Sequence, residues 1–80
     1  MICEILKFVK KPSRNGGYYY HTFLKGVDNG QAYFTYLAPK MRNWSRWKKV
    51  LKKGVVLKGL RIKKGKLIDA DSRFIVIENE

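Results

Sequence analysis

The chain has 80 residues, of which 18 are Lys or Arg and 6 are Asp or Glu, so its formal net charge is +12. This length predicts a single domain over residues 1–80 and argues against an enzyme built around a deep cleft. Hydrophobic residues make up 45% of the sequence, which is normal for a folded domain and excludes a disordered chain. A domain this small buries only about 60% of its unfolded surface, so we expect modest stability, or additional stability from a homodimer.

The basic residues are unevenly distributed. Residues 40–66 include twelve Lys or Arg and no Asp or Glu. A surface that serves only solubility mixes both signs, so this segment predicts a polyanionic partner, with nucleic acid ahead of an anionic membrane surface. No apolar run approaches the roughly 20 residues of a membrane span, and Glu4 and Lys7 interrupt the core of any signal peptide. We therefore expect a cytoplasmic protein with no membrane partner.

The residues that bind metals are scarce. One cysteine, Cys3, and one histidine, His21, cannot form an internal disulfide or supply a four-ligand zinc site. Cys3 lies in an apolar stretch, where we expect it to pack as a small hydrophobic residue. Asp69 and Asp71 would share a face of a regular strand, but they lack further acidic or histidine partners, so we expect a turn or bulge there. The sequence predicts no catalytic residue, metal or cofactor.

Three strands are predicted in the first half of the chain. The first, Ile2–Val9, is rich in aliphatic residues and ends at the basic, glycine-containing loop Lys10–Gly17. The second, Tyr18–Val27, is β-branched and aromatic, and the return strand Ala32–Ala38 follows it. Asn29-Gly30 between them predicts a type I′ turn, because that turn needs positive φ at both central positions.

A helix is predicted over 43–53. Trp44, Trp47, Val50 and Leu51 recur at three- and four-residue spacing and so share one helical face. Asn43 is placed to cap the start of this helix, and a glycine at position 54 is placed to end it in the left-handed conformation. We expect the two tryptophans to fill the base of the fold together with Leu51, not to stack on bases.

Two more strands close the chain. Val55–Lys63 alternates between apolar and polar residues, and the alternation changes parity at Gly59, which predicts a bulge there. Lys64-Gly65 is the next turn. The last strand is predicted over Lys66–Ile77, with an interruption at Asp69–Ser72.

The resulting order, β-β-β-α-β-β, is all-β with one short helix and resembles the five-stranded oligonucleotide-binding (OB) fold. In that fold, the face of strands 2–3 and the loops that join strands 1–2 and 4–5 hold the ligand. Here these loops are Lys10–Gly17 and Lys63–Lys66, both basic. The chain is similar, over nearly its whole length, to small OB-fold single-stranded-DNA-binding proteins of phages and plasmids. Residues 53–60 also resemble the fourth-strand pattern of bacterial single-strand-binding proteins.

One departure from this family is visible. The bacterial proteins carry a long acidic tail that recruits partners, and Glu78-Asn79-Glu80 is at most a remnant of one. An SH3-like small barrel is the main alternative fold, and the predicted helix between strands 3 and 4 weighs against it.

The turn at Asn29-Gly30 decides which residues of the aromatic hairpin share a face. One face holds Tyr19, His21, Phe23, Lys25 and Val27 with Ala32, Phe34, Tyr36 and Ala38. The other holds Tyr18, Tyr20, Thr22, Leu24 and Gly26 with Gln31, Tyr33, Thr35 and Leu37. The phenylalanines of the first face suit a barrel interior, and the Thr and Tyr residues of the second suit a wet stacking surface. We therefore expect the second face to bind, although Lys25 argues for the first, and a slip of one residue would exchange the two.

These observations and the resemblance predict non-enzymatic, largely sequence-independent binding of single-stranded DNA, in phage or plasmid replication or recombination and in the host cytoplasm. Tyr18, Tyr20 and Tyr33 would stack on bases, and His21 would contact phosphate when protonated. The residues expected to hold the phosphate backbone are Lys10, Lys11, Arg14, Arg61, Lys63, Lys64 and Lys66. The alternatives are an RNA-binding OB module and a basic protein-interaction subunit.

Overall fold

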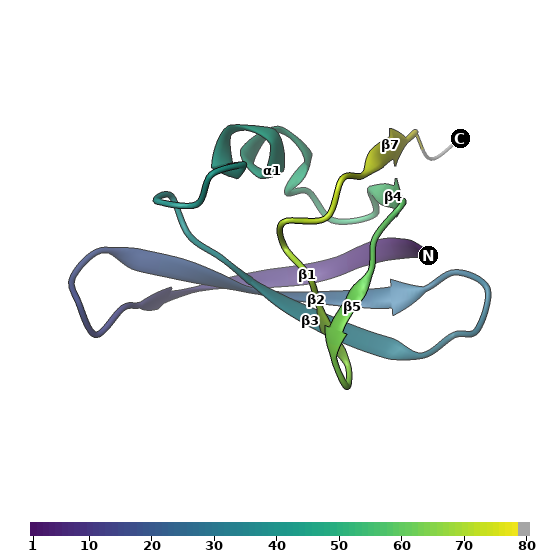
Figure 1. Ribbon diagram of the computed structural model, residues 1–80, viewed down its shortest axis with the longest axis horizontal. Helices are drawn as coiled ribbons and strands as arrows, with labels where there is room; N and C mark the ends of the chain where they lie inside the picture. The colour runs from purple at the N-terminus through teal and green to yellow at the C-terminus, as the bar shows by residue number, and fades with distance from the viewer. Residues whose placement is uncertain (79–80) are drawn as a thin grey trace.

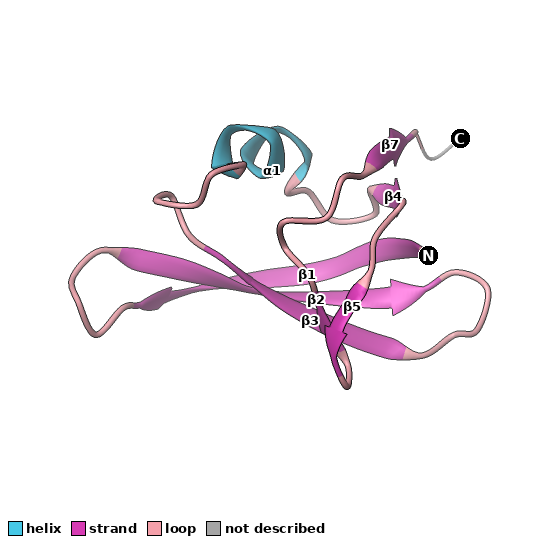
Figure 2. Cartoon of the chain, viewed as in Figure 1, coloured by secondary structure: helices cyan, strands magenta, loops and turns pink. Residues whose placement is uncertain are grey.

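The structure is a computed structural model that describes residues 1–78, and it consists mostly of strands with one short helix (Figures 1 and 2). The strands are β1 (Ile2–Pro12), β2 (Tyr18–Gly26), β3 (Ala32–Leu37), β4 (Val56–Lys58), β5 (Ile62–Lys64), β6 (Leu67–Ile68) and β7 (Ile75–Ile77), and the helix is α1 (Trp44–Val50). The predicted class, all-β with one short helix, is confirmed. The described residues form seven strands where five were predicted.

All seven strands belong to one sheet with the order β5-β6-β3-β2-β1-β4-β7, which curls into a half-barrel. The antiparallel pairs are β1 with β2, β2 with β3, β1 with β4, β4 with β7 and β5 with β6, and β3 pairs with β6 in parallel. Figure 1 shows α1, β4 and β7 together on one side of the long strands β1–β3. The side of the sheet that faces them is the inner face, and the opposite side is the outer face.

The strand predicted over 55–63 is split into β4 and β5 at Gly59. This residue has φ +91°, and a Cβ placed on it would lie 2.9 Å from the backbone oxygen of Arg73. Only glycine adopts this conformation at low cost and lets two backbone segments approach so closely. The chain therefore bends where the alternation changes parity, as the sequence indicated, but the bend ends one strand and begins another.

The last predicted strand is split in the same way, into β6 and β7. The Asp71 amide donates to Asp69 Oδ1 at 3.0 Å, and the Ser72 amide donates to the Asp69 carbonyl at 3.1 Å. The two aspartates thus form a turn, as expected, and Phe74 beyond it packs on Trp47 with ring centroids 4.7 Å apart. The prediction of five strands is wrong because these two local breaks each divide one strand.

The first hairpin is longer than predicted. β1 continues to Pro12, which pairs with Tyr18, so Lys10 and Lys11 lie in a strand and only residues 13–17 form the loop. Gly16 and Gly17 have φ +87° and +73° and close this loop. The end of the hairpin extends beyond the half-barrel (left in Figure 1), and we call its residues 9–20 the arm.

The turn between β2 and β3 is not the predicted type I′ turn. Gly30 has φ +67°, but no residue other than glycine has positive φ among residues 1–78. The loop spans 27–30, because the Gly30 amide donates to the Gly26 carbonyl and the Gly26 amide donates to the Gln31 carbonyl. Asn29 is held by its side chain, which accepts from the Gln31 amide at 3.0 Å and donates to the Tyr33 hydroxyl at 3.0 Å. This local bonding favours the longer loop.

The helix is shorter than predicted and is anchored by its side chains. Asn43 makes no side-chain cap, because its Nδ2 donates to the Ala70 carbonyl at 2.7 Å instead. Trp47 is fully buried, and its Nε1 donates to the same carbonyl at 2.7 Å. The helix ends at Val50, and the left-handed glycine at position 54 follows four residues later.

The core lies between the inner face and α1. Trp47 and Phe74 are its largest members, which confirms the expected core role of the second tryptophan. Cys3 is buried there as predicted, and burial raises the pKa of its thiol above the usual value. The other core side chains are Ile5, Leu24, Tyr33, Leu37, Val50, Leu57, Leu60 and Ile68.

Candidate nucleic-acid interface

The register of β2 and β3 divides their residues into the two faces that the sequence predicted. Tyr20 pairs with Leu37, Thr22 with Thr35 and Leu24 with Tyr33, and the alternate pairs point to the opposite side. Their burial is the reverse of the expectation. Thr22, Leu24, Tyr33, Thr35 and Leu37 are all buried, so the face predicted to bind is largely the wall of the core.

The two threonines suggested a solvated face, but both are buried, and Thr22 Oγ1 has no hydrogen-bond partner among the described residues. Thr35 Oγ1 donates to the Ile68 carbonyl of β6 at 3.0 Å, which satisfies a buried hydroxyl. Tyr33 is only 6% exposed and accepts the Asn29 hydrogen bond at its hydroxyl. Tyr33 is therefore a core residue, and its predicted role as an exposed stacking ring is wrong.

The outer face instead carries five rings, which we call the outer aromatic cluster: Tyr19, His21, Phe23, Phe34 and Tyr36. The His21 ring lies 4.3 Å from that of Phe23 and 4.8 Å from that of Tyr36, between centroids. Phe34 and Tyr36 lie 5.6 Å apart, and Tyr19 and Tyr36 lie 5.9 Å apart. Tyr36 is 48% exposed, and the other four rings are partly exposed. Large rings gathered on a solvated face mark a binding surface.

Lysines from two strands surround these rings. Lys7 pairs with Phe23, and Lys11 pairs with Tyr19. Lys25 pairs with Ala32, so all three lysines point to the outer face. Lys7 Nζ lies 5.0 Å from the centroid of the Phe23 ring, a cation–π contact. Glu4, which pairs with Lys25, is the only acidic residue within β1, β2 and β3. The outer face therefore combines rings with positive charge.

His21 contributes a ring more than a charge. Its pKa lies below the ordinary value because partial burial disfavours the charged form and because Lys11 is nearby. Both effects favour the neutral form of His21, and its ring lies against three aromatic neighbours, Phe23, Phe34 and Tyr36. The same effects disfavour the protonated form that the expected phosphate contact requires.

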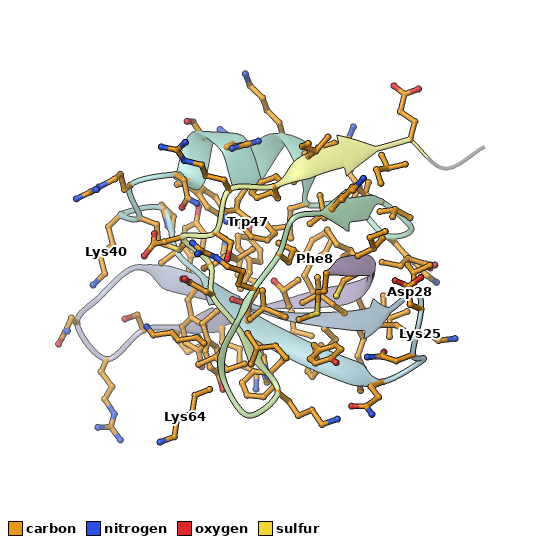
Figure 3. The ribbon with its side chains drawn as sticks, turned by 45° about the vertical axis from the view of Figure 1, so that its right-hand side comes forward. Phe8, Lys25, Asp28, Lys40, Trp47 and Lys64 are labelled. Atoms are coloured by element: carbon orange, nitrogen blue, oxygen red, sulfur yellow. The ribbon has the colours of Figure 1, made fainter. Side chains whose placement is uncertain are left out.

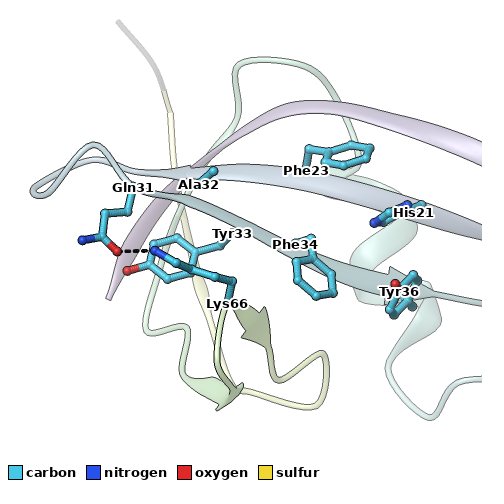
Figure 4. A pocket seen from close by; sticks show the side chains of 8 residues that line it. All are labelled: His21, Phe23, Gln31, Ala32, Tyr33, Phe34, Tyr36 and Lys66. Atoms are coloured by element: carbon cyan, nitrogen blue, oxygen red, sulfur yellow. Dashed lines mark hydrogen bonds between the residues drawn. The ribbon is translucent and has the colours of Figure 1, made fainter.

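A recess of about 650 Å³ opens at the end of β3 nearest the β2–β3 loop, and side chains of both faces line it (Figure 4). Lys66 Nζ donates to Gln31 Oε1 at its rim and lies 5.4 Å from the centroid of the Tyr33 ring. The residues that line the recess are His21, Phe23, Gln31, Ala32, Tyr33, Phe34, Tyr36 and Lys66.

Five of the predicted site residues belong to the arm: Lys10, Lys11, Arg14, Tyr18 and Tyr20. Lys10 and Arg14 are exposed, and Lys10 Nζ lies 4.0 Å above the Tyr18 ring. Tyr18 and Tyr20 are partly exposed and lie on the inner side of the arm, 5.5 Å apart. Tyr20 stacks on Trp44 with an interplanar angle of 9°. Tyr20 thus extends the core toward the arm, Tyr18 packs on Tyr20, and both lie away from the outer aromatic cluster.

The remaining predicted site residues are also exposed: Arg61 lies just before β5, Lys63 and Lys64 lie on it, and Lys66 lies in the turn after it. Figure 3 shows Lys64 at the tip of this turn. Lys63 lines a small recess together with Tyr36. Because the sheet order places β5 and β6 beyond β3 and places β1 beyond β2, the two predicted basic groups lie on opposite sides of the aromatic strands. The structure does not bring them together, and the outer aromatic cluster lies between them.

Six residues of this face were not among the predicted binding residues: Lys7, Tyr19, Lys25, Phe23, Phe34 and Tyr36. Lys25 could have indicated this face, because a lysine within a strand is almost never buried without a partner. The face that carries Lys25 was therefore the one to expect in contact with solvent.

No protein-family model matches this chain, and no curated protein or solved structure matches it either. Within residues 1–78, no helix is long and apolar enough to cross a membrane. The same part of the chain holds no group of three or more His, Cys, Asp or Glu side chains that could bind a metal ion.

Proposed function

We propose that this protein binds single-stranded DNA without catalysis and largely independently of sequence, through the outer face of β1–β3. The observation that carries the proposal is the outer aromatic cluster framed by Lys7, Lys11 and Lys25. Bases stack on exposed rings, and lysines neutralise the phosphates that connect them. A patch of rings that bound another protein through hydrophobic contact alone would be depleted of lysine.

The strand pairing supports an OB-type architecture for this function. β1 pairs with both β2 and β4, and β3 lies parallel to β6. If β4–β5 and β6–β7 are each counted as one interrupted strand, the topology has five strands, with a helix between the third and the fourth. The ligand of such a fold lies across strands 2 and 3 and meets the loops at either end. The arm and the β5–β6 turn would occupy these places.

The decisive measurement is a titration of labelled single-stranded DNA, double-stranded DNA and single-stranded RNA of equal length at one salt concentration. Single-stranded DNA is expected to bind at least about tenfold more tightly than the duplex, because paired bases cannot reach the rings. Equal affinity for the duplex would contradict the stacking role. Tighter binding of RNA would favour the RNA-binding module. If none of the three nucleic acids bound, the basic protein-interaction subunit would be favoured.

The biological setting is part of the proposal. A protein with this activity would coat DNA strands exposed during replication or recombination, as do the phage and plasmid proteins that the sequence resembles.

A further inference from the structure

The recess at the end of the outer aromatic cluster has the features of a slot for one nucleobase (Figure 4). Phe34 supplies a ring on one side, and the Lys66–Gln31 bridge forms the opposite rim. Ala32 also lines the recess, and its single methyl group occupies little of the space there. A concave, mostly apolar surface with a few polar groups is the usual form of a small-molecule site.

The two polar side chains of the rim are positioned by their backbones. The Phe34 amide donates to the Lys66 carbonyl at 3.1 Å, which ties the β5–β6 turn to β3. The Gln31 carbonyl accepts from Gly26 at 2.8 Å, and its amide donates to Asn29 Oδ1 at 3.0 Å. Lys66 also lies over the ring of the buried Tyr33. The bridge therefore joins two fixed points of the fold.

The bridge has a defined hydrogen-bonding character. An ammonium group has only donors, so the Gln31 side chain must turn its oxygen toward Lys66. This leaves the amide N–H groups of Gln31 and the remaining N–H groups of Lys66 available to a ligand. The rim consequently offers mainly donors, which pair with acceptors.

We infer that this recess selects a base with a keto group at its edge, such as thymine, uracil or guanine, over a base with an amino group there. Thymine presents the O4 acceptor where cytosine presents the N4 amino donor. At that position a donor on the rim pairs with O4 but not with N4, whose N–H groups are themselves donors. The inference rests on the proposed function, and it adds a preference at one base position to binding that is otherwise independent of sequence.

The test compares oligo(dU) with oligo(dC) of equal length, because these differ at C4 and neither carries the thymine methyl group. Fluorescence anisotropy at one salt concentration and at pH 7.5 gives the two dissociation constants, and their ratio is the readout. The native protein is expected to bind oligo(dU) roughly fivefold or more tightly, which is near the lower end of discrimination by a good side-chain–base contact. Equal affinities would overturn the inference and leave the proposed function standing. Failure to bind either oligonucleotide would overturn both.

Variants of the exposed Gln31 locate the effect without disturbing the core. Gln31→Met keeps the length of the side chain and removes its donors, so the ratio should fall to about twofold or less. Gln31→Glu presents only acceptors, so the ratio should shift further, toward oligo(dC). Lys64→Met is the matched control, because it removes a charge outside the recess. It should weaken the binding of both oligonucleotides without changing the ratio of their dissociation constants. A ratio that stays at the native value in Gln31→Met would overturn the assignment to this recess.

Discussion

Tyr33 and Tyr36 belong to one short strand, yet they lie on opposite sides of the sheet. Successive side chains of a strand alternate, so an interval of three residues places two side chains on different faces. Tyr33 is 6% exposed and packs in the core, whereas Tyr36 is 48% exposed beside His21. The same residue type therefore has a structural role at one position and a candidate binding role at the other.

Replacing each tyrosine by alanine should separate these roles. Tyr36→Ala is expected to weaken binding of single-stranded DNA by about 1–3 kcal/mol, the usual contribution of one stacked base, with little change in the thermal midpoint. Tyr33→Ala should instead lower the free energy of unfolding by roughly 3 kcal/mol, because it leaves a cavity in the core. Anisotropy titration and thermal denaturation of both variants provide the measurement. Native affinity in a folded Tyr36→Ala protein would contradict the outer-face assignment.

At the scale of elements, Gly59 determines how the second half of the chain completes the half-barrel. Its positive φ bends the backbone between β4 and β5, and its missing side chain leaves room for the Arg73 carbonyl. β4 can then pair with β1 and β7, while β5 pairs with β6 at the other edge of the sheet. The break in the strand thus lets one segment of chain serve both ends of the sheet.

Gly59→Ala should be more destabilising than the same change at another left-handed glycine. Both the strained φ and the 2.9 Å approach to the Arg73 carbonyl act at this position, and we expect a loss of roughly 2–3 kcal/mol in the free energy of unfolding. Gly16→Ala is the matched control, because Gly16 has φ +87° but no atom within 4 Å of the added Cβ. Urea denaturation of both variants measures the difference, and equal losses would show that the close approach contributes nothing.

At the scale of the whole molecule, the net charge of +12 is arranged around the outer face and also over α1. Lys7, Lys11 and Lys25 frame the rings, whereas Lys48 and Lys49 lie on the helix, on the opposite side of the sheet (Figure 1). Only the first group can contact phosphates of a strand that crosses β1–β3. The others add to the general attraction of a polyanion without a defined contact.

Affinity for oligo(dT) should therefore fall steeply when salt is raised about tenfold, from roughly 50 to 500 mM, because each phosphate contact releases counterions. Lys11→Met should reduce the slope of log K against log[salt] by about 0.7, the value for one contact on a single strand. Lys48→Met should leave the slope nearly unchanged. Isothermal or anisotropy titrations over the salt range measure both slopes. A flat dependence in the native protein would rule out the electrostatic part of the mechanism.

Much of the local structure could be predicted from the sequence. The alternation in β2 and β3 assigned every paired residue of that hairpin to the correct one of the two sets, because the period of two depends only on strand geometry. The parity change at Gly59 and the interruption at Asp69–Ser72 were also visible, because glycine and aspartate have local conformational preferences. The type I′ turn was predicted wrongly, because the hydrogen bond from Asn29 to Tyr33 favours the longer loop and is not visible in the local sequence.

The sequence by itself determined the strand-rich class, the single helix, the two sets of side chains and the unbalanced charge, since each follows from neighbouring residues or from composition. Only the tertiary structure decided which set faces the core. Thr35 and Tyr33 look polar in the sequence, but Ile68 and Asn29 provide their hydrogen bonds, and both residues are buried against the core. The rings that looked like core are left on the outer face, between lysines that only the sheet order brings to either side of them.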